Sequence, residues 1–162
     1  MEGFAFGRHG ALYEAHLVPN ADRTVELFLA LVEHLVPAVD VHLADARTGA
    51  TWDGEALANG DVRDAIARSK ATLATHAGTE VSITGGGEQL TLSANLELYA
   101  FARTDRWLYL LQGKGLQRVP RLRRRSWTLD AGEFRPLRPG EGSAGALIAA
   151  RLGMGGAASA GA

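Results

Sequence analysis

Two pairs of acidic and histidine residues have the types and spacing that metal or acid–base chemistry requires. Glu14 and His16 stand two positions apart, and so do Asp40 and His42 in a later segment. Side chains two positions apart on a β-strand share one face, so each pair would project together from its strand. Carboxylates and imidazoles bind divalent metals and act as general acids and bases. If the two strands are neighbours, the four side chains converge on one site.

The alternation of polar and apolar residues in these segments gives a simpler interpretation, which we favour. Each pair then belongs to the polar outer face of a half-buried strand, opposite an apolar inner face. The inner faces are formed by Tyr13, Ala15 and Leu17 in the first segment and by Val41 and Leu43 in the second. The sequence therefore predicts no catalytic residue, no bound metal and no cofactor. A metal-dependent enzyme is the third hypothesis for function.

A run of three glycines at positions 85 to 87 allows two interpretations. A phosphate-binding glycine loop leads from a strand into the first turn of a helix. Here the glycines are preceded by the alternating Val81 and Ile83, and they are followed by the longest alternating stretch of the chain, from Leu90 to Ala100. Glycines between two alternating runs are typical of a hairpin turn. We therefore expect a β-hairpin with a long central strand from residue 90 to residue 100.

Residues 114 to 138 contain eight Lys or Arg residues against two Asp or Glu residues, a net charge of +6 that leaves −7 on the rest of the chain. Clustered arginines beside an aromatic ring suit phosphate contacts and base stacking. The candidate anion or nucleic-acid contacts are Arg118, Arg121, Arg123, Arg124, Arg125 and Trp127. Alternatively, this segment folds back on the acidic body or is a solvated linker. A nucleic-acid-binding accessory protein is therefore the second hypothesis, because the whole chain is not basic and has no recognised nucleic-acid motif.

The predicted first helix, residues 21 to 36, is apolar over an arc of about 200°. A sheet covers a narrower stripe, so Leu27 and Leu31 are expected to need another cover. That cover is either a predicted C-terminal helix at residues 144 to 152 or a separate chain. The predicted partner-binding residues are Leu27, Leu31, Leu147, Ile148 and Leu152.

The order of predicted elements indicates a single α+β domain. We expect strands at 11–18, 39–45 and 50–53, a second helix at 61–76 and the hairpin described above. We also expect a short helix at 106–112, although the alternation of Trp107, Tyr109 and Leu111 fits a strand as well. These elements predict an antiparallel or mixed sheet with two main helices on one face, in β-αββ-αββ order. The boundaries are a flexible arm at 1–10, the core at 11–113, a basic Pro/Arg-rich extended segment at 114–143 and a short helix with a Gly/Ala-rich tail at 144–162. A small hairpin is predicted at 127–137.

The composition narrows the function classes further. The 162 residues include no cysteine, so disulfides, thiol nucleophiles and Cys-ligated zinc are excluded. No signal peptide or run of 18 apolar residues occurs, which predicts a cytoplasmic protein without a membrane partner. Arginine strongly outnumbers lysine, as in GC-rich bacterial coding. The first hypothesis is a non-catalytic bacterial protein–protein interaction module, such as an adaptor, an immunity-type inhibitor or an assembly component. Its partner would be another protein or a second copy of the chain.

Overall fold

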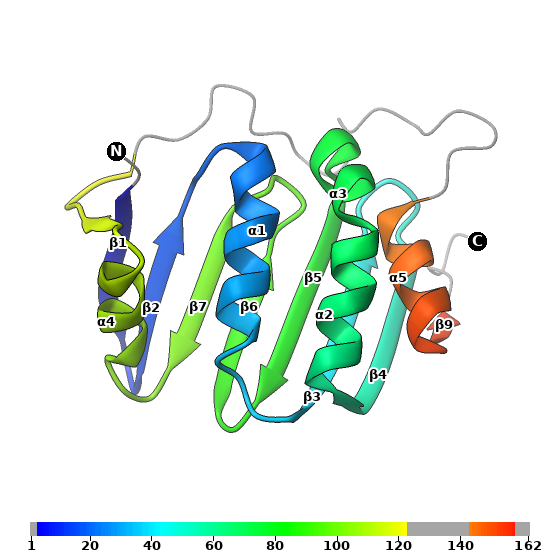
Figure 1. Cartoon of the computed structure of the whole chain (residues 1–162), viewed down its shortest axis with the longest axis horizontal. Helices are drawn as coiled ribbons and strands as arrows, with labels where there is room; N and C mark the ends of the chain where they lie inside the picture. Colours follow the sequence, from blue (N-terminus) through cyan, green and yellow to red (C-terminus); the bar gives the residue numbers. More distant parts are fainter. Residues whose placement is uncertain (1–2, 123–142, 158–162) are drawn as a thin grey trace.

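The structure is a computed structural model that describes residues 3–122 and 143–157. Its strands are β1 (Gly3–His9), β2 (Leu12–Leu17), β3 (Ala38–Asp45), β4 (Thr51–Ala58), β5 (Thr79–Gly85), β6 (Glu88–Leu92), β7 (Leu98–Ala102), β8 (Gln117–Arg118) and β9 (Gly155–Ala157). They form one sheet in the order β8-β1-β2-β7-β6-β5-β3-β4-β9 (Figure 1). Neighbouring strands are antiparallel, except that β8 is parallel to β1.

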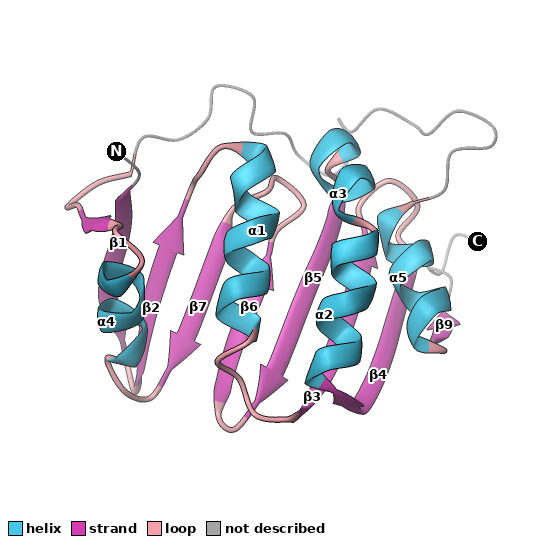
Figure 2. Cartoon of the chain, viewed as in Figure 1, coloured by secondary structure: helices cyan, strands magenta, loops and turns pink. Residues whose placement is uncertain are grey.

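The described helices lie together on one side of this sheet. They are α1 (Ala21–Val32), α2 (Asn59–Arg68), α3 (Lys70–His76), α4 (Arg106–Gly113) and α5 (Ala144–Leu152). Figure 2 shows all of them in front of the strands, and no described helix covers the opposite side. The α+β class predicted from the sequence is confirmed. Among the described helices, none has the length and apolar character needed to cross a lipid bilayer.

The core lies between the sheet and the helix layer. Leu17, Leu43, Ile83 and Leu92 project from four different strands toward the helices, and each is 0% exposed. Their neighbours along each strand point to the other side because side chains alternate with a period of two. The helices therefore bury the apolar half of each alternating segment and leave the polar half outside.

Helix α1 connects two strands that are not neighbours in the sheet. It follows β2 and precedes β3, and these strands are separated by β7, β6 and β5. The helix contacts β6 beneath it and packs against α2 and α3 beside it. Strands β5, β6 and β7, which come later in the sequence, thus lie in the sheet between β2 and β3.

The predicted long strand at 90–100 was wrong, because the chain reverses between β6 and β7. Ser93 N donates to Glu97 O at 2.8 Å, and Leu96 N donates to Ser93 O at 2.9 Å. Leu96 has a φ of 61° and is only 2% exposed, so an apolar residue in the turn continues the alternation of the strands. The hairpin at the three glycines is confirmed, with Gly86 at φ 62° and Gly87 at φ 78°.

The predicted flexible arm at 1–10 was also wrong, since Gly3–His9 forms β1. This strand pairs with β2 along its length, and its Phe4 side chain is 0% exposed. Gly10, at φ 61°, forms the turn into β2. Parts of the segments expected to be extended or unstructured join the sheet edges as β8 and β9, whereas the hairpin predicted at 127–137 lies outside the described residues.

Two predicted helices have different limits in the structure. Helix α1 ends at Val32 instead of residue 36, and the chain continues in a tighter turn in which Leu35 N donates to Val32 O at 3.0 Å. The helix predicted at 61–76 is divided by Ser69, whose φ of −104° and ψ of 7° separate α2 from α3. The helices predicted at 106–112 and 144–152 are confirmed as α4 and α5.

Candidate binding site on the open face of the sheet

Strands β2 to β7 direct a set of mostly polar side chains away from the helices, and we call this set the open face. The strand registers place on it Leu12, Glu14, His16, Asp40, His42, Ala44, Asp53, Glu80, Ser82, Thr84, Gln89, Thr91, Tyr99 and Phe101. Four of these residues are carboxylates, and none is Lys or Arg. The open face is therefore acidic, with aromatic rings concentrated on β7.

The two acidic–histidine pairs lie on this face but do not converge. Glu14 and His16 are on β2, and Asp40 and His42 are on β3, with three strands between them. At a strand spacing of about 4.8 Å, four spacings separate the pairs by about 19 Å. The described residues contain no group of three or more His, Asp or Glu residues that could hold a metal ion. The four-residue site required β2 and β3 to be neighbouring strands, and they are not.

The β3 pair has local partners of its own. His42 Nδ1 lies 2.6 Å from Asp53 Oδ1 across the β3–β4 ladder, and these side chains are 45% and 73% exposed. Asp40 Oδ1 accepts a hydrogen bond from Ala56 N at 2.9 Å. Such exposed ion pairs contribute about 0–1 kcal/mol to stability. Asp40 and His42 therefore each have a partner on β4, as expected for residues of a polar outer surface.

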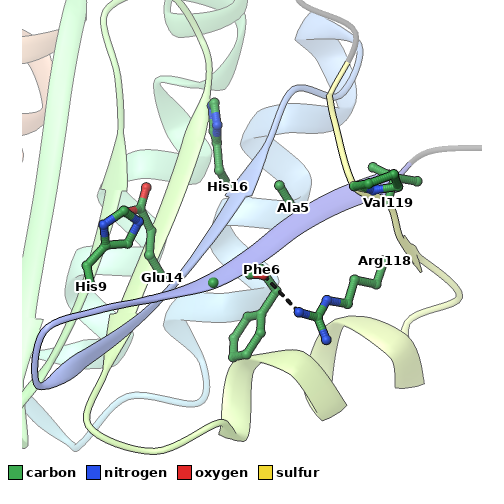
Figure 3. A pocket seen from close by; sticks show the side chains of 9 residues that line it. Ala5, Phe6, His9, Glu14, His16, Arg118 and Val119 are labelled. Carbon is green, nitrogen blue, oxygen red and sulfur yellow. Dashed lines mark hydrogen bonds and ion pairs between the residues drawn. The ribbon is translucent and has the colours of Figure 1, made fainter.

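The β2 pair, in contrast, borders a cavity of about 570 Å³, which we call the β1 cavity. Strand register places Ala5 and Gly7 on the same side as His16 and Glu14, so these small residues form its floor. The walls include His9, Glu14 and His16 on one side and Val119 on the other (Figure 3), and Pro120 also lines the cavity.

Gly7 lowers the floor of the β1 cavity, and packing among the described residues does not explain why a glycine stands there. A Cβ built at Gly7 would meet no heavy atom of the described residues within 4 Å. The φ angle of Gly7 is not positive, so its backbone conformation does not require glycine. Glycine inside a strand weakens the strand and often marks a place where another molecule approaches the backbone closely.

The carboxylates near the β1 cavity differ in burial. Glu14 Oε2 lies 3.0 Å from His9 Nε2, with side-chain exposures of 21% and 70%. The Glu97 side chain, directly before β7, is only 6% exposed, and its Oε1 accepts no hydrogen bond within the described residues. His16 Nε2 lies 3.7 Å from this oxygen, and the His16 ring stacks on Tyr99 at 4.3 Å.

Tyr99 contacts both His16 and Glu97, because its ring stacks on His16 and its hydroxyl donates to Glu97 Oε2 at 3.2 Å. Leu96, the residue before Glu97, has the positive φ described above. Strained positions of this kind persist only where the surrounding structure fixes them, and they are frequent near functional sites. The turn before β7 thus sets a buried carboxylate behind the His16 ring.

Arg118 also borders the β1 cavity, but its charge is directed elsewhere. Its Nη2 donates to Phe6 O at 3.0 Å, and its guanidinium lies 5.5 Å from the centre of the Phe6 ring. Figure 3 shows Arg118 and Phe6 on the side of β1 opposite to Ala5 and His16. The part of the cavity that lies on the open face is therefore bordered by the Glu14 carboxylate and the His9 and His16 imidazoles and not by the guanidinium.

Only part of the predicted basic site can be placed. Arg118 is engaged with β1, and Arg121 is exposed just beyond it. Arg123, Arg124, Arg125 and Trp127 lie outside the described residues. The described part of the basic segment thus shows one arginine with a structural role at the sheet edge.

The predicted partner-binding leucines are distributed between core and surface. Leu27 and Leu31 are 6% and 1% exposed within the single chain, where α1 packs against α2 and α3. Helix α5 packs mainly on α2 and on β3, β4 and β5, burying Ile148 completely while Leu147 stays 37% exposed and Leu152 half-buried. The expectation that α5 or a partner covers Leu27 and Leu31 needs correction, because both side chains are already buried within the described chain while α5 packs mainly on other elements.

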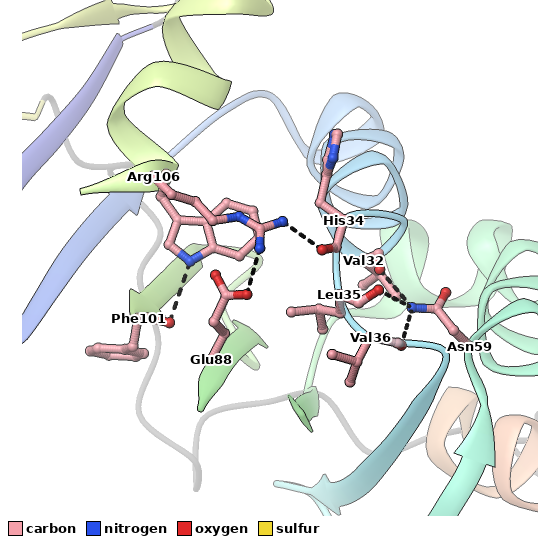
Figure 4. A network of polar contacts seen from close by, with 9 residues as sticks. Val32, His34, Leu35, Val36, Asn59, Glu88, Phe101 and Arg106 are labelled. Carbon is pink, nitrogen blue, oxygen red and sulfur yellow. Dashed lines mark hydrogen bonds and ion pairs between the residues drawn. The ribbon is translucent and has the colours of Figure 1, made fainter. Parts of the chain in front are cut away.

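A polar network fastens the helix layer to the sheet (Figure 4). Arg106 donates to Glu88 Oε1 at 2.7 Å and to His34 O at 2.5 Å, joining α4, β6 and the end of α1. Burial raises the pKa of Glu88, although Arg106 acts in the opposite direction. Burial also lowers the pKa of His34, and the positive charges of Lys114 and Arg106 lower it further.

Asn59 closes the other side of this network at the start of α2. It is 7% exposed, and its Nδ2 donates to Val32 O at 2.9 Å and to Val36 O at 3.2 Å. These carbonyls belong to the end of α1 and the turn after it, where helical partners are missing. The side chain therefore caps one helix from the first residue of another.

Sequence reasoning missed the β1 cavity because it assigned the first residues to an arm. The signal was present in the alternation of Phe4 and Phe6 with Ala5 and Gly7, which predicts a strand with a small-residue face. Glu97 and Tyr99 gave no comparable signal, since their proximity to His16 depends on the pairing of β2 with β7. No protein-family model, curated protein or solved structure matches this chain.

Proposed function

We propose that the protein is a non-catalytic interaction module that binds a partner with a basic surface through the open face. The observation that supports this proposal is the charge pattern, with four carboxylates and no Lys or Arg among the open-face residues. Complementary charge guides association and favours one partner over another. Tyr99, Phe101 and Leu12 add apolar area of the kind that contributes to interface cores. The partner is another protein, met in the bacterial cytoplasm.

The helix surface no longer supports this proposal, since Leu27 and Leu31 are buried within the chain. Nucleic acid is a weaker candidate for the open face, because phosphates would be repelled by its carboxylates. The open face also presents main-chain edges only at its ends, so recognition would depend on side chains of the central strands. An acidic sheet surface of this kind favours a folded or extended basic protein segment.

The test is an affinity capture from the native host with the full chain as bait. We expect capture of a protein with a basic surface, in a salt-sensitive manner. Asp53→Lys combined with Glu80→Lys reverses two open-face charges and should abolish capture. Glu33→Lys combined with Asp64→Lys changes the net charge equally on the helix layer and should leave capture intact. The proposal fails if the wild type captures no such protein or if both double variants capture it equally.

A further inference from the structure

We propose that the β1 cavity receives a lysine or arginine side chain of the partner. This inference depends on the proposed function, because it names the chemical group that the open face would recognise. It starts from the space that Gly7 leaves open and from the Glu14 carboxylate on β2. Each of these features is independent of the acidic character of the rest of the sheet.

The shape of the cavity suits a long side chain with a charged end. Ala5 and Gly7 provide a low floor, and Val119 and Pro120 provide an apolar wall. Lysine and arginine bury their methylene stems along such surfaces while the charged group reaches a polar partner. Beyond Phe4, no described strand pairs with the outer edge of β1, where Arg118 Nη2 donates to the Phe6 carbonyl at 3.0 Å.

The charge of the cavity favours a cation. Glu14 carries a carboxylate on the wall, and its neighbour His9 is 70% exposed and can be displaced by an incoming ammonium or guanidinium group. Behind His16, the Glu97 carboxylate is 94% buried and one oxygen accepts no hydrogen bond within the described residues. A buried carboxylate acts over a longer distance than an exposed one, because the surrounding protein screens it less than water does.

The positively charged neighbour does not oppose this assignment. The Arg118 guanidinium is held on the other side of β1 by the Phe6 carbonyl and lies over the Phe6 ring. A carboxylate or phosphate ligand would meet Glu14 without a facing guanidinium, whereas an ammonium or guanidinium ligand would form a charge-assisted hydrogen bond with it. The cavity therefore discriminates in favour of cationic side chains.

The experiment is a titration of the full-length, ¹⁵N-labelled protein with N-acetyl-lysine methylamide, followed by NMR. We expect shifts centred on Gly7, Glu14 and His16. Glu14→Gln should weaken binding about tenfold or more, as expected for loss of a charge-assisted hydrogen bond. Gly7→Val should also abolish the shifts, because it fills the open floor. Glu80→Gln is the matched control on the same face and should bind as the wild type does.

The same titration with the Nε-acetylated probe separates the charge from the stem, and we expect it to give no shifts at these positions. The inference is overturned if both probes bind equally, if the shifts spread equally over Asp53 and Glu80, or if Glu14→Gln binds as the parent does. Partner capture that is lost in the Asp53/Glu80 variant but unchanged in Gly7→Val would overturn the cavity alone. Lysine binding in the cavity without any partner capture would overturn the proposed function alone.

Discussion

The two faces of the central sheet show opposite uses of the same strands. On β3, β5 and β6, the side chains of Leu43, Ile83 and Leu92 point into the helix layer and are fully buried. Their immediate neighbours His42, Ser82 and Thr91 point to the open face and remain partly exposed. Because the side-chain period is two, each strand serves stability on one side while its other side is available for recognition. Substitutions one position apart should therefore have very different effects.

The largest difference is expected for Leu92 and Thr91, which are adjacent on β6. Leu92→Ala leaves a cavity under the helices and should lower the free energy of unfolding by about 2–5 kcal/mol. Thr91→Ala removes a side chain that contacts Ser82 Oγ at 3.0 Å and should cost about 1 kcal/mol or less. Urea denaturation of both variants measures the contrast. Equal costs would show that the open face also carries the stability of the fold.

A smaller difference is expected between polar contacts on the two sides. Asn59→Ala leaves buried carbonyls at the end of α1 without their donor and should cost about 1–3 kcal/mol. Asp53→Asn weakens the exposed contact with His42 and should change stability by about 0–1 kcal/mol. Thermal unfolding of the two variants checks this order. A reversed order would mean that the open-face ion pair, and not the helix cap, fixes the sheet edge.

The smallest effect is a pH dependence that arises on the helix side. Burial, together with Lys114 and Arg106, lowers the pKa of His34, while Glu33 acts in the opposite direction. Below the ordinary histidine pKa of about 6.5, the unfolded chain therefore binds more protons at this position than the folded chain. The free energy of unfolding should fall as pH falls through this window, and His34→Gln should reduce that slope. Urea denaturation between pH 7.5 and pH 5.5 tests it, and an unchanged slope in the variant would contradict the assignment.

The sequence by itself determined the local features of this protein. Alternation predicted β2, β3 and β5, the glycine run predicted the β5–β6 turn, and helical spacing predicted α4 and α5. These signals come from interactions within a few residues along the chain, so they survive without knowledge of the tertiary structure. Alternation failed where an apolar residue occupied a turn, at Leu96, and where glycines concealed a strand, at Gly3 and Gly7.

Only the tertiary structure decided which strands are neighbours, and with them the candidate site. The sequence places β2 and β3 on either side of one helix, yet β5, β6 and β7 insert between them and bring Tyr99 beside His16 instead of His42. That choice depends on burying the apolar faces of all the strands together under the helix layer, and no local pattern encodes it. The Glu14 and His16 side chains were visible in the sequence, but their setting beside a cavity and a buried Glu97 comes from residues far apart along the chain that pair across the sheet.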